Sequence, residues 1–130
     1  MPIRRKTVKK EKKITTSKNK AIFLARSAYA KKAEGIVVLN MRKIVNFCDF
    51  FVILSGTSDR QVRAIADGVA EALGRKGLKP LHIEGKKEAT WVLLDFGDVV
   101  AHIFQEETRK FYNLEHLWQD APKISWRGKS

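Results

Sequence analysis

The run of five apolar residues at positions 50–54, Phe-Phe-Val-Ile-Leu, constrains the fold more than any other segment. Its side chains do not alternate between apolar and polar, so a strand formed here carries apolar side chains on both faces. A one-sided sheet would leave one of those faces in water. We therefore expect a strand inside a sheet that is covered on both sides.

Periodic segments before and after this run supply the surrounding elements. The patterns predict helices over residues 20–32 and 58–77, a strand over 36–41, extended runs over 78–84, 91–95 and 99–104, and a final helix from residue 106 that ends before Pro122. Ser58 and Gln61 predict a capping box at the start of the second helix. This order indicates an α/β (α+β) fold, with a mixed β-sheet flanked by helices.

Two of these predictions name the residues that form a turn or a buried helix side. The last two extended runs are expected to form a hairpin whose tight turn contains Gly97. The final helix is expected to bury one apolar side, formed by Phe111, Leu114, Leu117 and Trp118.

The length and the cysteine count narrow the class of protein. A chain of 130 residues has the size of a single domain, and it buries enough surface to fold without disulfides. Cys48 is the only cysteine, which excludes an internal disulfide and fits a reducing compartment. Apolar runs are too short for a membrane helix and no secretory signal is visible, so a cytoplasmic protein is expected.

The formal charge of +12 is concentrated at the two ends of the chain. Residues 1–20 hold nine Lys or Arg against one acid, and residues 123–130 hold three bases and no acid, whereas the body is nearly neutral. We therefore expect a basic disordered tail over residues 1–19, a folded domain over 20–122 and a basic C-terminal tail over 123–130.

The leading tail has three open interpretations: a solubilising segment, a phosphate-binding segment, or an organellar transit peptide. The last is disfavoured because lysine dominates over arginine and no amphipathic stripe is present. If the tail binds RNA, the contacting residues are Arg4, Arg5, Lys6, Lys9, Lys10, Lys12 and Lys13.

Signatures of catalysis are weak. The triplet at residues 95–97, Asp-Phe-Gly, matches a magnesium-binding motif of protein kinases, but the chain lacks the catalytic-loop triplet and the Gly-rich loop. Asp95 and Asp98 could together hold a cation near a strand end, although nucleotidyl transfer needs further converging acids. We expect no metal site and no cofactor.

Three further residues have both a structural and a functional interpretation. Cys48 could pair with a histidine as a nucleophile, but a small buried hydrophobe is the usual role of a cysteine between aromatic residues. His102 within a strand is more often a core or edge histidine than a ligand. Trp91 opens a strand on the same face as Leu93 and Asp95, where it either packs in the core or anchors an interface.

Four ordered segments of the chain resemble one protein family. They are NFCDFFVILSGTSDRQV at residues 46–62, PLHIEG at 80–85, WVLLDFGDVVAHIFQ at 91–105 and FYNLEHLW at 111–118. Together they are similar to the ribosomal silencing factor family, RsfS, also called Iojap, over residues 20–122. Gln61 departs from the histidine that many members carry there.

The resemblance implies a nucleotidyltransferase-like fold that lacks the catalytic acids, and a protein that is not an enzyme. It implies binding to the large ribosomal subunit through the intersubunit-face protein numbered fourteen, which would prevent the small subunit from joining and repress translation. It also leaves open an organellar large-subunit assembly factor, a nucleotidyltransferase relative that remains active, and a homodimer. The long basic leader suggests an added contact with ribosomal RNA.

The resemblance also implies which residues meet the partner. The family's partner-facing surface corresponds to the hairpin region of residues 91–98. The expected contact residues are Trp91, Leu93, Asp95 and Asp98, with Glu84 and Glu88 as charges at the rim. Acids on a nearly neutral body suit a basic ribosomal protein, and a tryptophan supplies desolvated contact area.

Overall fold

The computed structural model describes residues 14–127 and has a mixed six-stranded sheet at its centre. The strand order is β3-β4-β5-β2-β1-β6. The strands are β1 (Glu34–Asn40), β2 (Phe50–Gly56), β3 (His82–Glu84), β4 (Trp91–Asp95), β5 (Val99–Gln105) and β6 (Lys123–Ile124). Only the β2–β5 pair is parallel among these neighbours, and β4 and β5 form the expected antiparallel hairpin. The predicted α+β class with a mixed sheet is confirmed.

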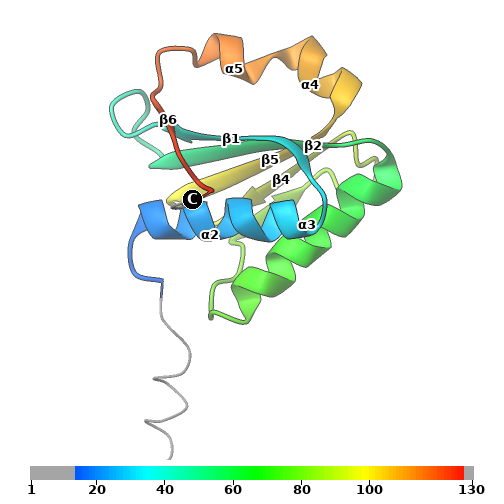
Figure 1. Cartoon of the computed structure of the whole chain (residues 1–130), viewed down its shortest axis with the longest axis horizontal. Coiled ribbons are helices and arrows are strands. Elements are labelled where there is room, and N and C mark those ends of the chain that lie inside the picture. The colour runs from blue at the N-terminus through cyan, green and yellow to red at the C-terminus, as the bar shows by residue number, and fades with distance from the viewer. Residues whose placement is uncertain (1–13, 128–130) are drawn as a thin grey trace, which may run out of the picture.

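Helices cover both faces of this sheet, as the apolar run at its centre requires (Figure 1). Helices α2 (Ser17–Ala30) and α3 (Asp59–Gly74) lie on one side, which we call the helix face. The short helices α4 (Glu106–Tyr112) and α5 (Leu114–Leu117) lie on the other side, the second face. All seven residues of β2 are buried, which confirms the prediction of a two-sided cover.

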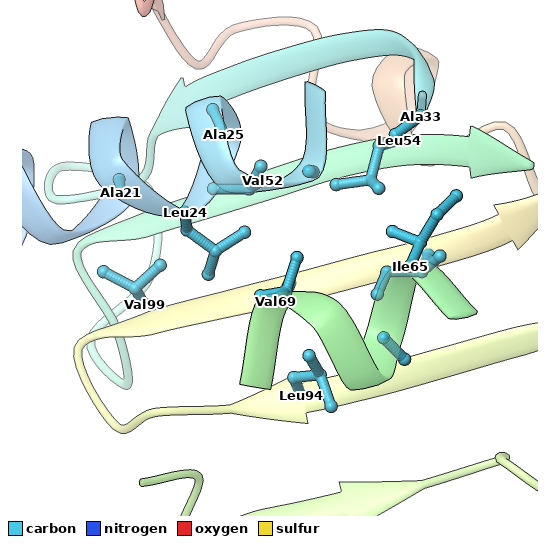
Figure 2. Close-up of a cluster of buried hydrophobic side chains, with 14 of the residues drawn as sticks. Ala21, Leu24, Ala25, Ala33, Val52, Leu54, Ile65, Val69, Leu94 and Val99 are labelled. Carbon is cyan, nitrogen blue, oxygen red and sulfur yellow. The ribbon is translucent and has the colours of Figure 1, made fainter. Parts of the chain in front are cut away.

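The larger of two cores lies between the helix face and α2 and α3 (Figure 2). Leu24 of α2, Val69 and Ile65 of α3 and Val52 of β2 meet there, all completely buried. The smaller core lies on the second face around Phe51, Ile53 and Phe104. Within residues 14–127, no helix is long and apolar enough to cross a membrane.

Side-chain hydrogen bonds cap the starts of α2 and α3. Thr16 caps α2, since its hydroxyl accepts from the amide of Asn19 at 3.1 Å. The hydroxyl of Ser58 likewise accepts from the amide of Gln61 at 3.1 Å. The returning half of the predicted capping box is shifted by one residue, because Oε1 of Gln61 accepts from the amide of Thr57 at 2.6 Å.

The prediction of one amphipathic C-terminal helix is wrong. Asn113 adopts φ = 48°, a left-handed conformation that divides the segment into α4 and α5. The break changes which side chains share a face. Leu114 and Trp118 pack against the smaller core, whereas Phe111 is 80% exposed and Leu117 is 63% exposed.

The predicted limits of the folded domain also need correction. Helix α2 already begins at Ser17, inside the expected tail of residues 1–19. Residues 123–127, expected to be part of a C-terminal tail, contain β6 and the buried Trp126, whose Nε1 donates to the carbonyl of Ile36 at 3.1 Å. The extended run predicted over 78–84 shortens to His82–Glu84.

Candidate partner-binding face

The alternation of β4 assigns its side chains to opposite faces of the sheet. Val92 and Leu94 are buried on the helix face, where they join the larger core. Trp91, Leu93 and Asp95 point to the second face and are only partly buried. The cover that α4 and α5 provide therefore stops short of complete burial along β4, and leaves a tryptophan, a leucine and a carboxylate within reach of a partner.

Trp91 is held within an aromatic group on the second face. Its ring lies 4.8 Å from that of Phe104 and 4.9 Å from that of Tyr112, measured between centroids. Its Nε1 donates to Nδ1 of His102 at 3.2 Å. The indole thus packs against the fold on one side while part of its surface remains accessible. Interface anchors and core residues share packing of this kind.

The register between strands adds polar groups to the same face. Glu84 of β3 lies opposite Leu93, and His82 lies opposite Asp95. Nε2 of His82 and Oε2 of Glu84 are 2.5 Å apart on the exposed edge. Asp95 is partly engaged, because its Oδ1 accepts from the amide of Gly97 at 2.7 Å within the hairpin turn. The face consequently has an apolar centre and a rim that contains carboxylates.

Two of the expected contact residues lie elsewhere. The carboxylate of Asp98 binds Nζ of Lys20 at 2.7 Å, which ties the hairpin turn to α2 in the helix layer. Glu88 is exposed on the loop between β3 and β4. That loop is fastened to α3, since Nε of Arg63 donates to the carbonyl of Lys86 at 2.9 Å. The structure brings Trp91, Leu93, Asp95 and Glu84 together and separates Asp98 and Glu88 from them.

Sequence reasoning missed the supporting aromatic residues Phe104 and Tyr112. Periodicity assigned the preceding residue, Phe111, to the buried side, but Phe111 is exposed and Tyr112 is the residue that contacts Trp91. His102 was expected to be a core or edge histidine, and it is buried with 5% exposure. Burial lowers its pKa to about 4, so the ring is neutral at physiological pH.

The chemistry of Cys48 does not fit an activated nucleophile. Its thiol is buried in the smaller core. Burial, together with the carboxylates of Asp49, Asp95 and Asp98, raises the pKa of the thiol to about 11. The expectation of a small buried hydrophobe is confirmed. Within residues 14–127, no group of three or more His, Cys, Asp or Glu side chains is placed to hold a metal ion.

A hollow of about 420 Å³ lies beside the start of α4, between Glu34, Ser55, Glu106 and Arg109. Glu106 interacts with Glu34 by hydrogen bonding and by charge repulsion, and this raises the pKa of the Glu34 carboxyl. The guanidinium of Arg109 is already bound to Ser55, to the carbonyl of Gly35 and to Glu115. The proposed RNA-contact residues of the tail, Arg4 to Lys13, lie outside the described residues.

Comparisons with known proteins agree with this fold. The family model described as "Ribosomal silencing factor during starvation" matches residues 14–129. A ribosomal silencing factor of Halalkalibacterium halodurans is 46% identical over 98 residues, which cover 75% of this chain and 84% of that protein. The mouse protein named mitochondrial assembly of ribosomal large subunit protein 1 is 34% identical over 91 residues, covering 68% of this chain and 40% of that protein.

A crystal structure of a protein from Chromobacterium violaceum superposes with a TM-score of 0.79 at 28% identity, covering 88% of this chain and 95% of that one. The match of the family model extends over all of the described residues, and it includes the β4–β5 hairpin and the second face. The chain therefore belongs to the ribosomal silencing factor family.

Proposed function

We propose that this protein binds the large ribosomal subunit through the second face and blocks joining of the small subunit, thereby repressing translation. The single observation that carries the proposal is the position of β4, which presents Trp91, Leu93 and Asp95 side by side on the incompletely covered face. Membership of the silencing factor family supplies the ribosome as the target.

The chemistry of the face suits a basic ribosomal protein, and the partner proposed is the one numbered fourteen on the intersubunit face. Half-buried Trp91 and Leu93 offer apolar area that loses water on contact. Asp95 and Glu84 at the rim favour approach of a positively charged surface. A folded domain bound at that position would occupy space that the small subunit needs, so the block is steric and requires no chemical step.

The protein acts without catalysis, cofactor or metal, and it acts in the cytoplasm. The folded unit that begins with α2 and includes β6 and Trp126 carries the activity, and the basic leader adds contacts with ribosomal RNA. The names of the similar proteins, which describe silencing and subunit assembly, support a regulatory role. If the chain forms a homodimer, sedimentation equilibrium of the purified protein will give twice the chain mass.

Sedimentation with purified subunits tests the central proposal. The protein should co-sediment with large subunits and not with small ones, and it should lower the yield of joined ribosomes at fixed magnesium. Equal binding to both subunits would contradict the proposal. An unchanged yield of joined particles at saturating protein would contradict the blocking step alone.

Trp91→Ala tests whether the second face is the contact. We expect a loss of about 2 kcal/mol in binding to the large subunit, roughly thirtyfold, while the chain remains folded. Tyr29→Ala is the matched control, because Tyr29 is an exposed aromatic residue on α2 in the opposite layer. Equal losses for the two variants would show that the contact lies elsewhere.

The leading tail is tested by its response to salt. Removing residues 1–13 should reduce affinity mainly at low ionic strength and flatten the plot of log affinity against log salt by about 0.7–0.9 per lost phosphate contact. Binding should persist, since the second face is unaffected. An unchanged slope would show that the tail makes no RNA contact.

A second candidate function is assembly of an organellar large subunit. The observation in its favour is the similarity to the mouse protein whose name describes mitochondrial large-subunit assembly. Cell fractionation and depletion separate the two functions. Loss of mature large subunits in an organelle after depletion would favour assembly, whereas excess joining of cytoplasmic subunits would favour silencing.

A nucleotide titration tests the remaining enzymatic alternative. We expect no hydrolysis or transfer with magnesium or manganese, because Asp98 is bound to Lys20 and Asp95 to the hairpin turn. Turnover that disappears in the Asp95→Asn and Asp98→Asn variants would contradict this.

A further inference from the structure

His102 lies on the second face, beside the proposed contact residues Leu93 and Trp91. In the strand register it lies between Leu93 of β4 and Ile53 of β2. Its imidazole meets the ring of Phe51 edge-on at 4.5 Å between centroids. With 5% of its surface exposed, His102 is too deeply buried to be a main contact for a partner itself.

The hydrogen bond from Trp91 determines where the imidazole carries its proton. The indole Nε1–H is a donor only, so Nδ1 of His102, 3.2 Å away, must be the acceptor and must be unprotonated. The proton of the neutral ring is then on Nε2. Among the residues that the structure describes, Nε2 has no hydrogen-bond partner, although it is fully buried.

An unsatisfied buried donor disfavours the folded state, so packing alone gives no reason for histidine at this position. A phenylalanine would fill similar space beside Phe51 without that cost. What the imidazole supplies and an apolar ring lacks is the acceptor at Nδ1. The feature that needs this acceptor is the indole of Trp91.

The indole needs an orienting group because its packing is incomplete. Phe104 and Tyr112 contact Trp91 at tilted angles of 30° and 49°, and the residue is only half-buried. Tilted aromatic contacts fix the orientation of a ring less strictly than a directional hydrogen bond does. A hydrogen bond from its one polar atom selects a single orientation, and fixing a contact residue before binding lowers the entropy lost in the complex.

We propose that His102 is a positioning residue of the partner-binding face, which fixes the orientation of the Trp91 indole through Nδ1. This rests on the proposed function in that Trp91 is taken to touch the partner. It also specifies the chemistry of that contact. Since the only donor of the indole is used internally, the partner meets the carbon edge and face of Trp91 with apolar groups rather than with a hydrogen-bond acceptor.

NMR spectroscopy of the full chain tests the positioning directly. The long-range ¹H–¹⁵N spectrum of the imidazole distinguishes a bare Nδ1 from a protonated one, and we expect a bare Nδ1 in the native protein. The indole resonance of Trp91, assigned with Trp91→Phe, should be sharp and slow to exchange with solvent. A protonated Nδ1 would overturn the proposal without the need for any variant.

His102→Phe removes the acceptor and keeps a ring, whereas His102→Asn keeps an oxygen near the position of Nδ1. In the first variant the Trp91 indole resonance should shift and exchange faster, and affinity for the large subunit should fall roughly three- to tenfold. The Asn variant should restore much of both. An unchanged indole resonance in a folded His102→Phe protein would contradict the positioning role.

A double-mutant comparison separates positioning from general loss of structure. In a Trp91→Ala background, His102→Phe should cause little further loss of affinity, because the residue that it positions is absent. A loss as large as in the native background would overturn the proposal. If the native protein does not bind large subunits at all, the proposed function fails, and the NMR measurements still decide whether His102 orients Trp91.

Discussion

Arg109 and Glu115 form a bidentate ion pair across the break between α4 and α5. Nε and Nη2 of Arg109 donate to the two carboxylate oxygens of Glu115 at 3.0 and 2.9 Å. Nη1 of the same guanidinium donates to the hydroxyl of Ser55 at 2.7 Å, and Nη2 also reaches the carbonyl of Gly35 at 2.7 Å. One side chain therefore joins both short helices to the end of β2.

We predict that Arg109→Lys destabilises the fold by roughly 2–3 kcal/mol, because a lysine cannot reproduce the planar fork. The side chains are 14% and 30% exposed, so solvent screens the pair little. Arg75→Lys is the control, since Arg75 and Glu71 form a pair that is 67% and 72% exposed, and it should cost less than about 0.5 kcal/mol. Urea unfolding measures both; equal midpoint shifts would contradict the prediction.

Glycine is required at position 85 for two reasons. Its φ of +87° is in the left-handed region, and a Cβ there would overlap the backbone carbonyl oxygen of Trp91. Gly85→Ala should therefore destabilise the chain by roughly 3 kcal/mol or more. Gly77 has a similar φ of +81° but open space around it, so Gly77→Ala should cost only about 1–2 kcal/mol. Thermal unfolding that ranks the two variants equally would show that the overlap is relieved.

The neutral state of His102 predicts how stability depends on pH. Its pKa falls from 6.5 to about 4 on folding, so between those values the unfolded chain binds the additional proton. The contribution of His102 to stability is complete above pH 6.5 and is lost as the pH falls towards 4, with a total of about 3 kcal/mol. His102→Phe should flatten the slope of unfolding free energy in this interval. Parallel slopes for the two proteins would contradict the assignment.

Cys48 should react slowly with thiol reagents in the native protein. With a pKa of about 11, about one thiol in a thousand is ionised at pH 8, and burial restricts access further. Modification by an aromatic disulfide should be at least roughly a hundredfold slower than in the chain unfolded in urea. Since Cys48 is the only cysteine, the absorbance change reports this site alone. Equal rates in the two states would show that the thiol is accessible.

The elements with strong local signals were predicted well from the sequence. The apolar run at residues 50–54 predicted a strand with both faces buried, and β2 is such a strand. The apolar repeat around Val62, Ile65 and Val69 predicted α3, whose buried side includes all three. In both cases the side-chain pattern and the tertiary environment favour the same structure.

The errors arise where one residue or a distant contact decides the outcome. Asn113 ends α4 in a left-handed conformation, which apolar periodicity does not reveal. Trp126 lies in a basic segment that resembles a tail, and it is buried only because β1 and α2 lie beside it. For the candidate site, alternation placed Trp91, Leu93 and Asp95 on one face, but the attachment of Asp98 to Lys20 depends on how α2 crosses the sheet.

The parallel pairing of β2 with β5 determines when the chain can fold during its own synthesis. These neighbours in the sheet come from residues 50–56 and 99–105, and the whole of α3, β3 and β4 lies between them in the sequence. A nascent chain that ends before β5 presents the apolar β2 with one edge unpaired, a state that favours aggregation. The β2–β5 pair therefore cannot form until residues 99–105 have left the ribosome's exit tunnel.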